Sequence, residues 1–246
     1  MIDLIYCASG NKQYAQIAID SGWKYGGRLP AKIYYPPYFT DQDYNAPNRT
    51  GYMQSLATYH PHLATVLDCL EESQYSEMMS WAEEAAQFVQ TVILIPKVRG
   101  IIKRLPRHIN GKDIRLGYSV ATSYGRTEVP FTEFDGWDVH LLGGAPHVQM
   151  RLARNHLKGT VSADTNYHQK LANQHCQYWQ PGTATFARNR YFPRLDELNG
   201  EKWGDGTNKA GANYEAFRRS CLAIIQAWRG EPITLWGVNP DQPKLF

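Results

Sequence analysis

Short apolar runs alternate along the chain with longer stretches in which apolar residues recur every three or four positions. The short runs predict strands, and the longer stretches predict amphipathic helices. Strands are predicted at residues 4–9, 32–39, 63–68, 91–98, 114–120, 139–143, 159–164 and 233–238. Helices are predicted at residues 11–21, 49–59, 73–89, 146–156, 167–178 and 214–228.

This alternation of strands and helices indicates an α/β protein with a mainly parallel sheet. Up to eight strand-like runs fit one TIM-like (β/α)8 barrel over residues 1–246, without a zinc subdomain. The second and last strand–helix units of this barrel could be irregular. In the second, Pro36 and Pro37 remove two backbone hydrogen-bond donors from the strand-like run. Residues 180–212 are polar and glycine-rich, which predicts a long loop or an insertion. A doubly wound open sheet is the alternative fold.

Two of the predicted strands end on a carboxylate, Asp68 in "LATVLD" and Asp164 in "GTVSAD". The carboxyl ends of parallel strands form the active-site face in both candidate folds, so either acid could serve as a nucleophile or a general base. Either could equally cap the helix that follows. Gly143 and Gly144 follow a third strand, where they form a plain turn or let a flat ligand approach bare backbone N–H groups.

Composition and charge exclude several classes of protein. The net charge is only +3, with a pI of about 8.6, so charge alone says little about nucleic acid. The four cysteines are widely spaced, which argues against a disulfide framework and a cysteine-pair zinc site. The N-terminal residues resemble neither a signal peptide nor a membrane span, which favours a cytoplasmic location. The chain has no dinucleotide, P-loop or nucleophile-elbow motif, so we expect no cofactor and no metal.

A basic segment at residues 97–115 is the remaining charged feature. It is either a solvated connection or a surface that grips phosphates near the mouth of the barrel. Its candidate nucleic-acid-binding residues are Lys97, Arg99, Lys103, Arg104 and Arg107.

Three ordered pieces, "ATVLDCLEESQYSEMMSWAEEAAQF", "VHLLGGAPHVQMRL" and "GTVSADTNYHQKLA", resemble the tRNA-guanine transglycosylase superfamily. The DNA-modifying branch of phages and bacteria is the most similar. These are (β/α)8 barrels that exchange guanine for a 7-deazaguanine base. The resemblance covers roughly residues 60–175, and its weight lies in the order and spacing of the pieces.

The resemblance implies roles for particular residues. Asp164 becomes the nucleophile that forms a covalent glycosyl-enzyme, and Asp68 accepts hydrogen bonds from the base edge. Gly143 and Gly144 form a backbone platform beside the base, and His168 is a further substrate-binding candidate. The family's early Asp-Ser-Gly-Gly-Phe-Gln motif and its zinc-binding cysteines are absent from this sequence. Asp41 or Asp43 is the candidate replacement for the aspartate of that early motif.

The expected function is therefore exchange of guanine for a 7-deazaguanine base in nucleic acid, DNA more than RNA, in a bacterial or phage-infected cell. The partners would be nucleic acid and the free base, with a second copy of the chain or another protein allowed, and with no membrane. One alternative is a barrel that binds nucleic acid but has lost the reaction. Another is a glycosidase or deoxyribosyltransferase that acts on free nucleosides.

Overall fold

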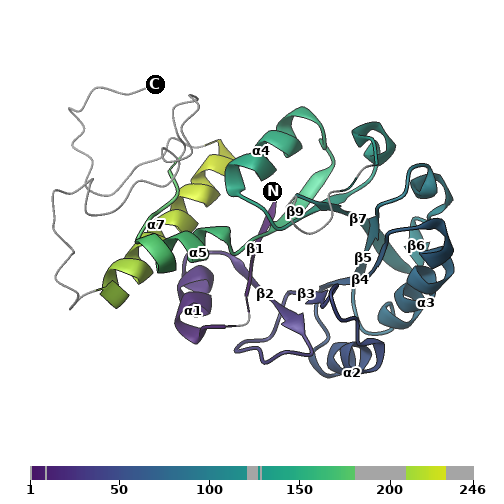
Figure 1. Cartoon of the computed structure of the whole chain (residues 1–246), viewed down its shortest axis with the longest axis horizontal. Helices are drawn as coiled ribbons and strands as arrows, with labels where there is room; N and C mark the ends of the chain where they lie inside the picture. The colour runs from purple at the N-terminus through teal and green to yellow at the C-terminus, as the bar shows by residue number, and fades with distance from the viewer. Residues whose placement is uncertain (1, 9, 121–126, 128, 181–208, 231–246) are drawn as a thin grey trace.

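The computed structural model describes residues 2–8, 10–120, 127, 129–180 and 209–230, which form a closed parallel barrel (Figure 1). Its eight strands are β1 (Asp3–Cys7), β2 (Lys24–Leu29), β3 (Phe39–Gln42), β4 (Leu63–Cys69), β5 (Thr91–Pro96), β7 (Lys112–Ser119), β8 (Val139–Leu142) and β9 (Thr160–Asp164). The strands follow one another around the ring in chain order, and the pairings β1–β9 and β5–β7 close it. A short strand, β6 (His108–Ile109), pairs antiparallel with β7. The predicted (β/α)8 barrel is confirmed, and the open-sheet alternative is wrong.

Helices surround the ring of strands. They are α1 (Lys12–Asp20), α2 (Arg49–Tyr59), α3 (Tyr75–Ala85), α4 (Pro146–Asn155), α5 (Tyr167–His175) and α7 (Lys209–Arg229). The start of α1 is capped by Asn11, whose side chain accepts from the backbone N–H of Gln13 at 2.9 Å. Figure 1 shows α5 beside α7, and α7 also contacts α1. None of the described helices is both long and apolar enough to span a membrane.

Two connections depart from the regular strand–helix alternation, and a third holds a 3-10 helix among its described residues. Residues 30–38, between β2 and β3, contain no helix, as the prolines of this unit suggested. The β5–β7 connection holds the 3-10 helix η2 (Ile101–Arg104), and η4 (Phe131–Phe134) precedes β8. A further 3-10 turn, η1 (Glu72–Gln74), leads into α3. Irregularity at the second unit was therefore predicted, whereas that after β5 was not.

Some sequence-based boundaries are wrong. The strand predicted at residues 32–39 is instead the connection to β3, which starts at Phe39 and takes in three residues expected to be loop. No strand was predicted at β2, although it pairs with both β1 and β3. The α7 helix begins at Lys209, so the end of the 180–212 segment is helical. The strand predicted at residues 233–238 and the rest of that segment, residues 181–208, lie outside the described residues.

The barrel interior is filled below its carboxyl end. Its apolar side chains come from Ile5, Phe39, Leu63, Ile93 and Ile95, all buried. Glycines make room for them: a Cβ added at Gly26 would lie 2.9 Å from Cδ1 of Phe39, and one at Gly117 would lie 2.8 Å from Cγ1 of Ile95. A packed interior leaves the ends of the strands as the place for a ligand, as in other (β/α)8 barrels.

Candidate functional site

A cavity of about 470 Å³ opens at the carboxyl ends of the strands, and we call it the mouth cavity. Each of the eight barrel strands contributes one lining residue: Cys7, Arg28, Asp41, Asp68, Ile95, Ser119, Leu142 and Asp164. The size lies within the range of small-molecule sites. Three of these residues are carboxylates, so the cavity favours a ligand rich in hydrogen-bond donors.

Asp164 ends β9 and is nearly buried, with 9% of its surface exposed. Its Oδ1 accepts two hydrogen bonds, from the backbone N–H of Gly143 at 3.2 Å and from Nε2 of His140 at 3.1 Å. The capping alternative is wrong, because the side chain of Thr165 accepts the N–H of Tyr167 at the start of α5. The carboxylate of Asp164 is thus held at the cavity wall by two N–H groups.

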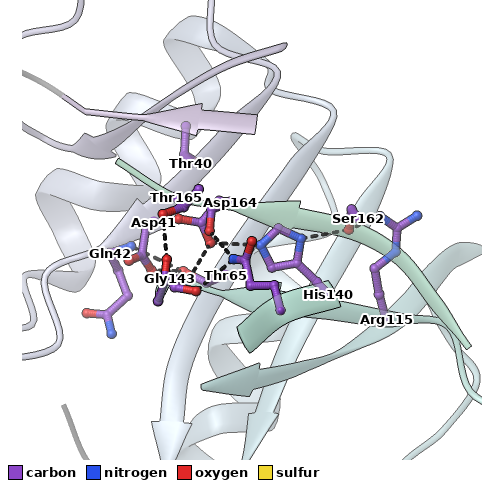
Figure 2. A network of polar contacts seen from close by, with 12 residues as sticks. Thr40, Asp41, Gln42, Thr65, Arg115, His140, Gly143, Ser162, Asp164 and Thr165 are labelled. Atoms are coloured by element: carbon purple, nitrogen blue, oxygen red, sulfur yellow. Dashed lines mark hydrogen bonds and ion pairs between the residues drawn. The ribbon is translucent and has the colours of Figure 1, made fainter. Parts of the chain in front are cut away.

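Figure 2 shows that His140 lies between Asp164 and a second polar side chain. Nδ1 of His140 is 2.7 Å from Oγ of Ser162, and Arg115 donates to the same Oγ at 2.7 Å. The constellation contains the three residue types of a hydrolase triad, but the hydroxyl of Ser162 is fully buried. The group that borders the cavity is the carboxylate of Asp164.

Asp41 is the penultimate residue of β3 and lies close to Asp164 in the cavity wall (Figure 2). Burial raises the pKa of its carboxyl to about 7, and the charges of Asp164 and Asp68 act in the same direction. Thr65 donates to Oδ1 at 2.6 Å, which opposes that shift in pKa. Such a carboxyl can hold and release a proton near neutral pH. Asp41 lines the cavity and Asp43 does not. Asp43 instead forms an exposed ion pair with Arg28.

Asp68 is held by Lys97, whose Nζ lies 3.5 Å from Oδ2 and donates to Oγ of Ser119 at 2.9 Å. Burial raises the pKa of Asp68, and the lysine charge opposes this. Burial likewise lowers the pKa of Lys97, whose side chain is 5% exposed. The capping alternative is wrong here too, because Glu71 is the residue that caps the following turn.

The two glycines after β8 have different roles. Gly143 lines the cavity at φ 62°, and its N–H donates to Asp164. Gly144 has φ 83°, and a Cβ there would lie 2.5 Å from Cγ1 of Val120. Its carbonyl accepts from the hydroxyl of Thr165 at 2.7 Å. Gly143 therefore lines the cavity, whereas Gly144 is required because the turn packs against Val120 without space for a side chain.

His168 does not reach the mouth cavity. It is fully buried, stacks on Phe217 with ring centroids 4.8 Å apart and packs against Trp23. Burial lowers its pKa to about 3, so the ring is neutral. The structure makes it a core residue that joins α5 to α7, in place of the substrate-binding role expected for it.

The basic segment does not form one face at the mouth. Lys97 is buried against Asp68, while Arg104 pairs with Glu72 and covers the ring of Tyr75. Arg107 lies 3.5 Å from the ring centroid of Trp137, and its carbonyl accepts from Ile114 near the amino end of β7. That end of the barrel is opposite the cavity. The remaining two candidates, Arg99 and Lys103, are exposed.

Sequence reasoning missed several binding or supporting groups of the site, among them Arg28, Arg115, His140 and Ser162. A polar residue at alternate positions of an otherwise apolar strand, as in "VHLLGG" and "GTVSAD", was the signal for His140 and Ser162. In a barrel these positions point inward. Within the described ranges, no group of three His, Cys, Asp or Glu residues is placed to hold a metal ion.

The family model that matches residues 18–229 is described as a family of unknown function, DUF6610. Because this match spans most of the chain, the chain belongs to that family. No curated protein matches the chain. The chemistry of the mouth cavity is therefore the ground for a functional proposal.

Proposed function

We propose that this member of the DUF6610 family is a pentosyltransferase that exchanges guanine for a 7-deazaguanine base in nucleic acid, with DNA favoured over RNA. The observation that carries the proposal is the presence of two different carboxyl groups, Asp164 and Asp41, in the lining of one cavity. Asp164 is a carboxylate held by two N–H donors, and the raised pKa of Asp41, about 7, lets that residue carry a proton.

The reaction would run in two displacements. An oxygen of Asp164 attacks C1′ of the sugar, the bond from C1′ to the base breaks, and its electron pair leaves with the base, which Asp41 protonates. In the second step Asp41 accepts the proton of the incoming base as that base attacks C1′. The C1′–O bond to Asp164 then breaks, and its electron pair returns to the carboxylate. The logic is that of retaining glycoside hydrolysis, with a base in place of water.

Asp68 supports recognition of a guanine-like base. Its carboxylate lines the same cavity and accepts hydrogen bonds, which suits the N1–H and exocyclic amine of guanine. A base without these donors would leave Asp68 with Lys97 as a partner but without its hydrogen bonds to the base, at a cost of about 1–3 kcal/mol for each lost bond. The target nucleotide would have to leave the helical stack to reach the cavity.

A second candidate is pentosyl transfer between free nucleosides. It is favoured by the position of Arg107 at the far end of the barrel, and by the pairing of Arg104 with Glu72. Neither residue then offers phosphate contacts at the mouth. The two candidates differ in salt dependence, because affinity for a nucleic acid falls steeply with ionic strength and affinity for a neutral nucleoside does not.

The test is intact-mass analysis after incubation with guanine-containing DNA, RNA and free deoxyguanosine, with and without added 7-deazaguanine. A denaturation-stable adduct on the wild type that is absent in Asp164→Asn supports the glycosyl intermediate, and the substrate that gives it identifies the class. Rapid quenching guards against fast turnover. Salt-sensitive binding without any adduct or exchanged base would instead favour a barrel that only binds nucleic acid.

A further inference from the structure

The barrel interior contains a chain of polar side chains that the proposed reaction does not use directly. It runs from Arg115 on β7 through Ser162 on β9 and His140 on β8 to Asp164 (Figure 2). The β8–β9 register sets His140 opposite Ser162, so the chain is built by strand pairing. Its inner members are fully buried, with both His140 and Ser162 at 0% exposure.

The donors and acceptors in this chain fit in one direction. The guanidinium of Arg115 has only N–H groups to offer, so Oγ of Ser162 must accept from it. An ionised Asp164 only accepts, so Nε2 of His140 must carry a proton. In a neutral ring Nδ1 is then unprotonated, and the hydroxyl of Ser162, which still has its own proton, is placed to donate to it. Asp164 therefore selects the Nε2–H tautomer of a neutral ring, and Ser162 supplies the matching donor.

The surroundings of His140 also favour the neutral ring. The imidazole stacks on Phe39 with ring centroids 4.8 Å apart. Burial lowers the pKa of His140, and the charge of Arg115 acts in the same direction, while Asp164 and Asp3 oppose it. A neutral ring with a fixed proton is a directional donor that does not change its charge during a reaction at Asp164.

Both N–H donors to Asp164 meet the same oxygen, Oδ1. Among the described residues none donates to Oδ2, which leaves that oxygen for a substrate. Hydrogen bonds from neutral donors to a carboxylate favour its ionised form and fix its plane. The backbone carbonyl of Asp164 is held as well, by the side-chain amide of Gln149 at 2.8 Å.

We infer that His140 is a positioning residue for Asp164, in the Nε2–H tautomer that the carboxylate requires and that Ser162 matches by donating to Nδ1, so that Oδ2 is presented to the substrate. The inference rests on the proposed function only for what Asp164 does to that substrate. The tautomer of His140 and its hold on Asp164 can be measured without any activity.

The first experiment is nitrogen-15 NMR of the histidine rings in the wild type. A protonated Nε2 and an unprotonated Nδ1 for His140, unchanged from pH 5 to pH 9, are expected. Ser162→Ala should change the Nδ1 resonance, because that nitrogen loses its donor. A His140 ring with its proton on Nδ1, or one that becomes doubly protonated in this range, would overturn the inference whatever reaction the protein performs.

The second experiment compares His140→Gln with His140→Leu by the rate of adduct formation on Asp164. The glutamine keeps an N–H group near the place of Nε2, whereas leucine fills similar space without a donor. Loss of such a supporting hydrogen bond to a charged group should slow the step about 10–100-fold in the leucine variant, and glutamine should restore most of the rate.

The matched control is His168→Leu. His168 is also a fully buried histidine, but it packs in the core away from the mouth cavity. The variant should lose stability without slowing adduct formation in the folded protein. Equal rates for wild type and His140→Leu would refute the positioning role and leave the proposed function standing. A correct His140 tautomer in a protein that forms no adduct and exchanges no base would refute the proposed function and leave the positioning of Asp164 standing.

Discussion

Nε2 of His140 lies 3.1 Å from Oδ1 of Asp164, and these two side chains come from neighbouring strands of the barrel. One is sealed in the interior and the other borders the mouth cavity. The contact connects the packed interior to a cavity carboxylate that is held by two N–H donors. It explains why a strand that is buried for most of its length can end on an acid, because His140, inside the barrel, donates a hydrogen bond to the carboxylate.

The first prediction concerns Asp164 itself. Asp164→Asn keeps the size of the side chain and an oxygen that can accept from His140 and Gly143, so the protein should stay folded. The amide is a poor nucleophile, so adduct formation and base exchange should fall to background. Activity is measured by intact mass, and folding by thermal unfolding.

Asp20→Asn is the matched control, because Asp20 is an exposed aspartate at the end of α1 and does not line the cavity. It should keep activity near that of the wild type. Full activity in Asp164→Asn, with the protein folded, would exclude Asp164 as the nucleophile.

The second prediction is a pH dependence caused by Asp41. Its pKa is about 7 in the folded protein and near 3.8 when the side chain is free. Between these values the folded state holds a proton that the unfolded state has released, so stability should fall as pH rises from about 4 to about 7. The same deprotonation removes the acid of the first step, so the rate should fall above neutral pH.

Asp41→Asn should flatten this part of the stability profile, as measured by urea unfolding at pH 5 and pH 8. Thr65→Val removes the hydroxyl that donates to Asp41 and should move the basic limb of the rate profile to higher pH. An unchanged slope of stability with pH in Asp41→Asn would show that another group titrates in this range.

The barrel could be predicted from the sequence because most strands are short apolar runs between amphipathic helices. The β2 strand was missed for a physical reason. Its inward positions carry Lys24, Gly26 and Arg28, since a glycine makes room for Phe39 and the two charged side chains lie toward the ends of the barrel. The usual hydrophobic signal of a strand is therefore lost. The β3 strand has only four residues and follows two prolines, so its start was misplaced.

The site could be predicted only in part. Asp68, Asp164 and Gly143 stand at strand ends, which is a local property of the sequence. The contact between His140 and Ser162 depends on the β8–β9 register, and the pKa of Asp41 depends on Asp164, Asp68 and Thr65 from other strands. Such relationships join residues far apart in the chain, and no local pattern encodes them.

The third prediction separates the two glycines after β8. Gly144→Ala should cost about 1–2 kcal/mol for the left-handed backbone. Overpacking should add about 1–3 kcal/mol, because the new Cβ would meet Val120. Gly143→Ala should cost only the backbone part, since a Cβ there meets nothing within 4 Å. Urea unfolding of both variants gives the difference, and equal losses would show that the contact with Val120 relaxes at no cost.

The last prediction concerns the ion pair of Asp68 and Lys97. Lys97→Met removes the positive charge from a nearly buried carboxylate while keeping much of the side-chain volume. Breaking a buried pair typically costs about 3–5 kcal/mol, and the loss should be largest at high pH, where Asp68 must ionise without its partner. Because burial raises the pKa of Asp68, the carboxylate can take up a proton as the pH is lowered, so the variant should regain part of its stability relative to the wild type. The double variant Lys97→Met with Asp68→Asn should recover stability at high pH, because neither charge is then buried alone. Chemical unfolding at pH 5 and pH 9 checks this. A Lys97→Met loss that is the same at both pH values would mean that packing, rather than the charge of Asp68, makes Lys97 important.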